Sequence, residues 1–492
     1  MKPASVGASV LLASALACGH TPTRTASPSP PDARRGSDSS RRGPAGPVVG
    51  EYAVRYDGQG ELRVEATLDR SGRVLTVERG VEDFVDDLEI KADGAEWTRG
   101  ERDGRSFLAA PCELGPCSLR YRVRLRAAAR AIGDLDVASE EGEVIEAPPS
   151  SWLLAPERRD GGGRVRFRVE TTESTRFCTG VLRSREIEGA WDIALGDLWT
   201  SPYSVFGPLR VRALEESGGA VELAIAPGAL AVSDDDLADW TRDSARAVAG
   251  YFGRFPLAEA LVLVVPSRGR WIGEGKTLSG GGGAIFIRVG EHAPKKKLHE
   301  DWVLVHEMTH LAFPTVAREH DWAEEGLATY VEPFARARAG ILSIEDAWLG
   351  LADGLPNGLP TAGDRGLDRT PTWGRTYWGG ALFYLLADVE IRKRTQGRFG
   401  LEHALRAILT AGGDNAHRWA LDDAFDVGDR ATGVPVLREL HRAMGTSPHP
   451  VDLDALWREL GVVRASGAIR FDDAAPLAAI RRAITTPDPR GR

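Results

Sequence analysis

Apolar and polar residues alternate along much of the first half of the chain. Between residue 49 and about residue 225, the segments "EYAVRY", "LRVEATL", "LRYRVRL", "RVRFRVET" and "VELAIA" repeat with a period of two and are separated by turns containing Gly and Asp. Successive side chains of a strand point to opposite faces, so this pattern predicts half-buried antiparallel strands. We therefore expect an N-terminal antiparallel, β-sandwich-like domain over residues 49–228, with the arginines of "RVRFRV" on its solvent face.

The pattern changes at about residue 232. Ser233 and the aspartates 234–236 are typical of an acidic helix start, and "LADWTRDSARAVAGYFGRF" follows with helical spacing. An apolar strand "ALVLVVP", a long glycine-rich loop, a second strand "AIFIRVG" and the helix "HEDWVLVHEMTHLAF" come next, and then a helix from about 322 to 339. A mixed sheet followed by helices indicates an α+β domain, expected at residues 229–345, and residues 346–492 predict a C-terminal helical domain.

Composition narrows the class of protein. A chain of 492 residues is too long for one ordinary core, and 42% apolar with 27% charged residues is normal for a globular protein. The net charge of -9 argues against a nucleic-acid partner, because phosphate binding needs a concentrated positive field.

The N-terminus carries the pattern of an export signal. Lys2 precedes the short apolar run "VGASVLLASALA", so we expect residues 1–18 to be a signal peptide that is removed. "ALAC" before Gly19 resembles a bacterial lipobox and implies a lipid on Cys18 as the only membrane attachment; the alternative is ordinary secretion after "ALA". Residues 19–48 are dense in Pro, Ser and Arg and predict a disordered tether. The expected location is the cell envelope, at the outer membrane or in the periplasm.

The remaining cysteines fit an oxidising compartment. Cys112 and Cys117 flank the turn-forming spacer "ELGP", which predicts a small-loop disulfide. Cys178 has no evident partner and is expected to be a buried small hydrophobe.

The segment "VHEMTH" contains the main candidate for chemistry. On a helix, His306 and His310 lie on one face and can aim two nitrogens at one point about 2.0 Å from each. Glu307 lies one position round the helix, where it can act as a general base on a metal-bound water. The apolar flanks "WVLV" and "LAF" indicate that the polar residues line a cleft or are buried. The alternative is a pair of core histidines with ordinary hydrogen-bond partners.

A third ligand is available downstream. A six-residue step from His310 reaches Val316, which excludes the zincin class that has its third ligand there. In "WAEEGLATYVE", a second helix could bring Glu325 or Glu324 to the metal, but only one of them, because adjacent residues face about 100 degrees apart. A His/His/Glu site binds one zinc ion and leaves a position for water.

"HEMTH", "WAEEGLATY" and "YWGGALFYLLADVEIRKRTQGRFGLEHALRAIL" together resemble the gluzincin metallopeptidases, nearest the glycyl aminopeptidase family, over residues 230 to about 410. The resemblance implies a thermolysin-like zincin catalytic domain and a Trp-x-x-Glu-Gly motif, which selects Glu325 as the ligand. It also implies that Tyr377, in "YWGGAL", hydrogen-bonds the oxyanion. The implied function is a zinc-dependent peptidase with a peptide or protein substrate, Glu307 as general base and Tyr377 as oxyanion stabiliser.

One departure from these families affects the type of peptidase. Related aminopeptidases have a glutamate-bearing segment for the substrate amine, whereas the equivalent place reads "SGGGGAIFIRVG", without an acid. Aminopeptidase and endopeptidase action therefore both remain open. Residues 280–283 are either a site of close approach for a peptide backbone or a surface loop. The opposing hypothesis is a catalytically inactive binding lipoprotein on a peptidase scaffold.

Overall fold

The computed structural model describes residues 46–69, 74–113, 115–156, 162–216, 218–465 and 467–487. The predicted signal peptide, Cys18 and all but the end of the predicted tether lie outside these residues. Within the described ranges, no helix has both the length and the apolar character that crossing a membrane requires.

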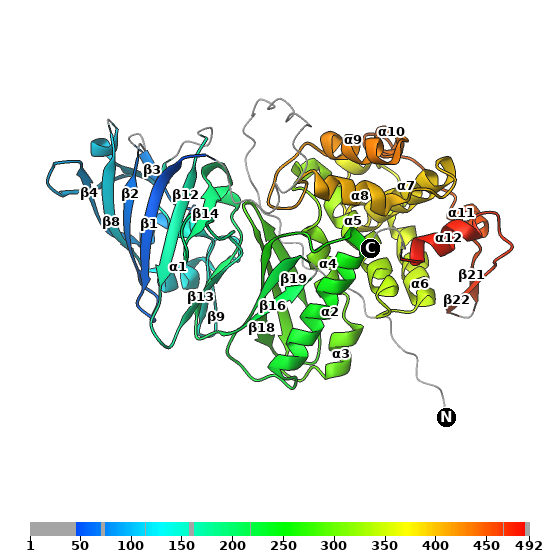
Figure 1. Ribbon diagram of the computed structural model, residues 1–492, viewed down its shortest axis with the longest axis horizontal. Helices are drawn as coiled ribbons and strands as arrows, with labels where there is room; N and C mark the ends of the chain where they lie inside the picture. The colour runs from blue at the N-terminus through cyan, green and yellow to red at the C-terminus, as the bar shows by residue number, and fades with distance from the viewer. Residues whose placement is uncertain are drawn as a thin grey trace. The chain divides into compact units, whose positions relative to one another are not determined.

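Strands dominate the N-terminal part (Figure 1). A seven-stranded sheet has the order β14-β12-β1-β2-β8-β4-β5, and two four-stranded sheets have the orders β13-β15-β10-β9 and β11-β3-β7-β6. The strands are β1 Val48–Tyr56, β2 Leu62–Leu68, β3 Val74–Thr76, β4 Val85–Ala92, β5 Thr98–Arg99, β6 Glu101–Asp103, β7 Ser106–Leu108, β8 Cys117–Val123, β9 Ser139–Glu141, β10 Val144–Glu146, β11 Ala155–Pro156, β12 Arg164–Glu170, β13 Arg176–Thr179, β14 Trp191–Ala194 and β15 Ser204–Gly207; helix α1 is Leu125–Ile132.

The period-two pattern of this part is confirmed. Buried and exposed residues alternate strictly along β2, and the buried side chains of β1, β2 and β8 share one core. Two details differ from the prediction. Strand β1 pairs with β12 in parallel, not antiparallel. Arg166 of "RVRFRV" is 5% exposed and forms an ion pair with Asp192, because a buried guanidinium requires a charged partner.

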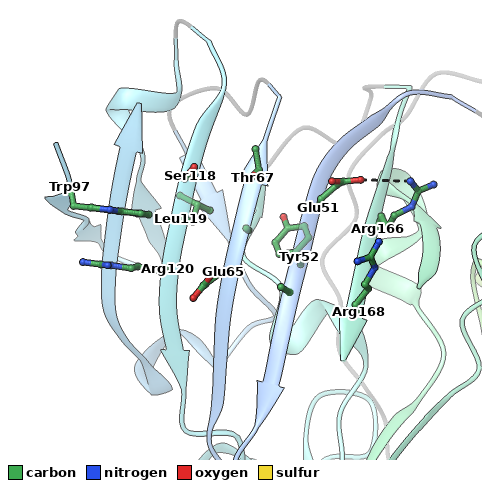
Figure 2. Close-up of a pocket in the computed structure, with 12 residues that line it drawn as sticks. Glu51, Tyr52, Glu65, Thr67, Trp97, Ser118, Leu119, Arg120, Arg166 and Arg168 are labelled. Atoms are coloured by element: carbon green, nitrogen blue, oxygen red, sulfur yellow. Dashed lines mark ion pairs between the residues drawn. The ribbon is translucent and has the colours of Figure 1, made fainter. Parts of the chain in front are cut away.

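The seven-stranded sheet has a hollow on its polar face (Figure 2). Arg120 lies over the ring of Trp97 at 4.4 Å, and Arg166 is 3.6 Å from Glu51. None of the predicted catalytic or metal-binding residues lines this hollow.

A five-stranded mixed sheet forms the centre of the chain, with the order β16-β17-β18-β20-β19. Its elements are β16 Arg210–Glu216, β17 Gly219–Ile225, β18 Glu259–Ser267, β19 Ile272–Ser279 and β20 Gly283–Gly290. Neighbours β17, β18 and β20 are parallel, and β19 is an antiparallel edge strand. Both faces are covered, because Val262 and Ile285 belong to the helical core whereas Leu261 and Phe286 pack with Tyr203 and other residues of the N-terminal part.

One predicted strand lies in a different sheet from the one expected, and one predicted loop contains a strand. "VELAIA" was expected in the N-terminal β domain, but as β17 it belongs to the five-stranded sheet, because it pairs with the buried strand β18. The expected glycine-rich loop contains the strand β19, which its polar and glycine-rich sequence hid. The domain limits at residues 228 and 345 remain predictions.

Helices make up most of the rest of the described chain, which Figure 1 colours from green to red. They are α2 Asp234–Phe252, α3 Lys295–Glu300, α4 Val303–His310, α5 Asp321–Arg338, α6 Ile344–Gly354, α7 Gly380–Arg394, α8 Leu401–Thr410, α9 Leu421–Thr432, α10 Val436–Met444, α11 Leu453–Leu460 and α12 Ala478–Thr485. Helix α2 has the acidic start that was predicted, and Ser233 also caps it through a capping box with Asp236. A short hairpin, β21 Val462–Ala465 with β22 Ala468–Phe471, interrupts the predicted helical domain.

The helix predicted over "HEDWVLVHEMTHLAF" is two helices. It breaks between α3 and α4 at Asp301, whose carboxylate accepts hydrogen bonds from the backbone N–H groups of Val303 and Leu304. These are free donors at the start of α4, so Asp301 caps the helix that carries the two histidines.

The cysteine predictions are confirmed. Cys112 and Cys117 form a disulfide, and Cys178 is a free, buried thiol.

Candidate metal centre

Helix α4 places the two histidines of "HEMTH" side by side. The ring centroids of His306 and His310 are 5.0 Å apart, as expected for side chains one helical turn apart. Trp302, one turn earlier, contacts the His306 ring edge-on at 5.6 Å. Both imidazoles are largely buried and direct Nε2 towards the next helix, α5.

Glu325 of α5 completes the cluster. Its Oε2 lies 3.3 Å from Nε2 of His306 and 3.5 Å from Nε2 of His310. Donors about 2.0–2.1 Å from a tetrahedral zinc are separated by about 3.3 Å, so the three side chains fit this ion. About a quarter of the Glu325 side chain is exposed, which leaves access for solvent.

The charges of the cluster reinforce one another. Burial alone would raise the pKa of the Glu325 carboxyl, but His310 and His306 together hold this pKa well below its usual range. Burial likewise opposes the charging of His310, yet the carboxylates of Glu325, Glu307 and Glu324 raise its pKa to about 9. Without a metal, these carboxylates keep a proton on His310, and a zinc ion would have to replace that proton.

Glu324, the rival ligand, points elsewhere. Its Oε1 accepts a hydrogen bond from the backbone N–H of Val316, at 2.9 Å. Burial raises the pKa of Glu324 to about 7. Adjacent residues of a helix face about 100 degrees apart, so the side chain that stabilises the loop after α4 cannot also reach the histidines.

Two glycines let α5 and α7 approach closely. A Cβ atom added to Gly326 would lie 2.3 Å from the Cα of Gly380, and one added to Gly380 would lie 2.2 Å from the carbonyl oxygen of Trp322. Neither position has room for any side chain. Close packing of α5 against α7 thus explains why "EEGL" and "WGGAL" have glycine at these positions. The contact brings the start of α7 next to Glu325.

Tyr377 lies in a π-helical turn, Gly374–Gly379, directly before α7. Such turns are rare and are frequent at functional sites. The Tyr377 ring stacks against His306 with centroids 6.3 Å apart. Burial raises the pKa of Tyr377, and the charges of Glu325 and Glu307 and a hydrogen bond with Glu325 raise it further. The hydroxyl therefore remains a protonated donor within the cluster.

The edge strand β19 fixes Glu307. The hydroxyl of Thr277 lies 2.7 Å from Oε2 of Glu307 and 3.0 Å from its carbonyl oxygen. A Cβ atom on Gly275 would lie 2.8 Å from Oε1 of Glu307, so this glycine allows the strand to pass beside the carboxylate. Because β19 was not predicted as a strand, Thr277 and Gly275 were missed.

Glu146 is a further residue that sequence reasoning missed. It is fully buried at the end of β10, and neither carboxylate oxygen has a hydrogen-bond partner among the described residues. Burial raises its pKa to about 8, with Glu141 adding to the rise and Arg288 opposing it. The Tyr203 hydroxyl also has no partner, and its pKa is raised by burial and then by charges that include Glu146 and Glu307. Tyr203 thus lies within electrostatic range of both carboxylates. No motif marks "EVIEAPP", so no local signal could have identified this residue.

The glycine-rich segment 280–283 has partners within the protein. The backbone N–H groups of Gly280, Gly281 and Gly283 donate to the carbonyl oxygens of Asn415, Ala416 and Gly180, so this segment is neither a surface loop nor free to pair with a peptide.

Solved structures share this fold. An aminopeptidase N family protein from Idiomarina loihiensis aligns over 84% of this chain and 78% of its own, with a TM-score of 0.63 and 14% identity. An M1 zinc metallopeptidase from Deinococcus radiodurans aligns over 83% of this chain and 97% of its own, with a TM-score of 0.51 and 17% identity. A mutant of the latter bound to a Tyr-Ser-Ala substrate gives a TM-score of 0.52 at 17% identity, over 82% of this chain and 95% of its own.

At this level of identity the likeness concerns the fold alone. The chain has the α+β fold of M1 zinc metallopeptidases, as the predicted resemblance to gluzincins implies. No protein-family model and no curated protein matches the sequence.

Proposed function

We propose that this protein is a zinc-dependent peptidase that uses His306, His310 and Glu325 as metal ligands. One observation carries the proposal: Nε2 of His306 and Nε2 of His310 both lie within 3.5 Å of the same carboxylate oxygen of Glu325. Glu307 and Tyr377, the two further groups that peptide hydrolysis needs, lie beside these ligands. Neighbours in fold are zinc peptidases, which supports the same function.

The chain's own groups account for the steps of hydrolysis. Zinc in this site would polarise the scissile carbonyl and lower the pKa of a water molecule towards about 7. Glu307, oriented by Thr277, accepts the proton of the attacking water and delivers it to the leaving amine. Tyr377 donates a hydrogen bond to the oxygen that becomes negatively charged when the carbonyl is attacked. Its raised pKa keeps that proton in place.

A pair of adjacent glutamates provides the test. Glu325→Gln is expected to lose most of its zinc and its peptide hydrolysis, because a neutral amide binds the cation poorly. Glu324→Gln is the matched control: it keeps an acceptor for the N–H of Val316 and should retain one zinc at this site and near-normal activity. Metal analysis and a peptide-library digest measure both. Full zinc content at this site in Glu325→Gln, or a wild-type protein that binds zinc but cleaves no peptide, would contradict the proposal; the second result favours an inactive binding protein.

We further propose that the enzyme is an aminopeptidase and that Glu146 receives the substrate's free amine. Two observations support this. The Glu146 carboxyl is fully buried and has no hydrogen-bond partner among the described residues, and both Glu146 and Glu307 lie within electrostatic range of the Tyr203 hydroxyl. A buried group of this kind requires an explanation, and an ammonium ion would pair with it. Glu146 would then take the role of the acid absent from "SGGGGAIFIRVG".

Peptides with free and acetylated N-termini test this role. A hydrogen bond to a charged group contributes about 1.5–3 kcal/mol, so Glu146→Gln should lower kcat/KM for free-amine peptides by about 10- to 100-fold. Acetylated peptides should be poor substrates of the wild type, and the substitution should not affect their cleavage. Efficient cleavage of acetylated peptides by the wild type would indicate an endopeptidase instead.

We also propose that the protein acts in the cell envelope, attached by a lipid on Cys18. The lipobox-like "ALAC" and the disulfide between Cys112 and Cys117 support export to an oxidising compartment. Metabolic labelling with palmitate should label the wild type and not Cys18→Ala. An unlabelled wild type in the culture medium would indicate ordinary secretion.

A further inference from the structure

A second histidine–carboxylate cluster lies outside the candidate active site. His320 ends the turn before α5, Asp368 lies in the loop after α6, and His441 is on α10. Nδ1 of His320 is 2.9 Å from Oδ1 of Asp368, and Nε2 of His441 is 3.2 Å from Oδ2. One ligand atom from each residue lies within 4.8 Å of the others. The side chains are 11–18% exposed, so the cluster is sheltered but reachable from solvent.

Both ring nitrogens of His441 face carboxylates. Nδ1 lies 3.0 Å from Oδ1 of Asp422, and Nε2 lies 3.2 Å from Oδ2 of Asp368. A neutral imidazole has one N–H, so the other nitrogen would direct a lone pair at an oxygen. Either the ring carries a second proton, or a cation binds between Nε2 and Asp368. The outer hydrogen bond from Nδ1 to a carboxylate is the usual support of a metal-binding histidine.

The second cluster has the same donor types as the candidate active site, two imidazoles and one carboxylate. Its nitrogen-to-carboxylate distances of 2.9 and 3.2 Å lead to different oxygens of Asp368, whereas the distances of 3.3 and 3.5 Å at Glu325 lead to one oxygen. Donors of this kind suit zinc, with a fourth position open to water. The Trp322 indole also donates to Asp368 at 2.8 Å, which orients the carboxylate.

We propose that His320, Asp368 and His441 bind a second divalent transition-metal ion, zinc, separate from the candidate active site. This ion would connect three segments, because 48 and 73 residues separate Asp368 from the two histidines. It would also fix the first turn of α5 through Trp322, three residues before Glu325. Its role is therefore structural, and it supports the helix that carries Glu325.

Zinc content by mass spectrometry, measured on the full chain after equilibration with zinc and removal of free metal, tests the proposal. We expect two zinc ions per chain in the wild type, one in His441→Gln and one in His310→Gln. The control His292→Gln replaces an exposed histidine outside both clusters and should retain two. Added zinc should raise the melting temperature of His310→Gln by several degrees, because only the second site remains to bind it.

The two sites are distinguishable in this design. If His310→Gln holds no zinc and its melting temperature does not respond to added zinc, the second site does not exist and His441 is a doubly protonated ion-pair partner. If His441→Gln holds as much zinc as the wild type, the proposal is equally wrong. Should His441→Gln fail to fold, the stoichiometry of the wild type and of His310→Gln still decides. If only the candidate active site fails to bind zinc, every variant that keeps His441 still holds one zinc ion at the second site.

Discussion

Replacing Glu307 by glutamine is expected to lower kcat for peptide hydrolysis by about 10²–10⁴-fold, the range for losing a general base. Glutamine has nearly the same shape and still accepts the hydrogen bond from Thr277, but it cannot accept the proton of the attacking water. Glu307 contributes no ligand atom to the His306, His310 and Glu325 cluster, so zinc content should be unchanged. Steady-state kinetics and metal analysis on the same preparation measure both effects.

The exposed Glu345 provides the control for this experiment. It lies on the surface in the first turn of α6, and Glu345→Gln should have wild-type kinetics. If Glu307→Gln retains zinc and hydrolyses peptides at the wild-type rate, Glu307 is not the base.

Replacing Tyr377 by phenylalanine should lower kcat by about 10²–10³-fold with little change in KM, because an oxyanion donor acts chiefly in the transition state. The ring would still stack against His306, so the loss isolates the hydroxyl group. The experiment measures kcat, KM and the affinity for a non-cleaved inhibitor in the wild type and in Tyr377→Phe.

Tyr384, in the same region, provides the control that distinguishes a catalytic role of Tyr377 from a packing role. The Tyr384 hydroxyl donates to the carbonyl oxygen of Ala323 and connects α7 with α5. Tyr384→Phe should lower the free energy of unfolding by about 1 kcal/mol and leave kcat near the wild-type value. Equal losses of kcat in both variants would mean that Tyr377 acts only through packing.

Local patterns in the sequence predicted the elements that depend on local physics. Strict alternation identified β2, and the spacing of His306 and His310 identified one face of α4. The resemblance to gluzincins selected Glu325 over Glu324, and the two side chains do point in different directions. The roles of these residues remain proposals until zinc binding and hydrolysis are measured.

The features that were missed depend on tertiary contacts. Strand β19 is an edge strand without a period-two pattern of buried residues. Its glycine, Gly275, lets the strand pass beside Glu307. The break at Asp301 depends on a cap that the surrounding apolar run conceals. Glu146 lies in an ordinary strand, and its complete burial is a property of the folded chain that the strand's own sequence does not show. The sequence by itself reveals none of these contacts.

Anomalous diffraction at the zinc edge, on crystals of the protein grown with zinc, tests the central claim most directly. We predict a peak about 2.0–2.2 Å from Nε2 of His306, Nε2 of His310 and a carboxylate oxygen of Glu325, with solvent in the fourth position. The absence of a peak between these three side chains, with the imidazoles bonded to protein groups or Glu325 turned outward, would contradict the account.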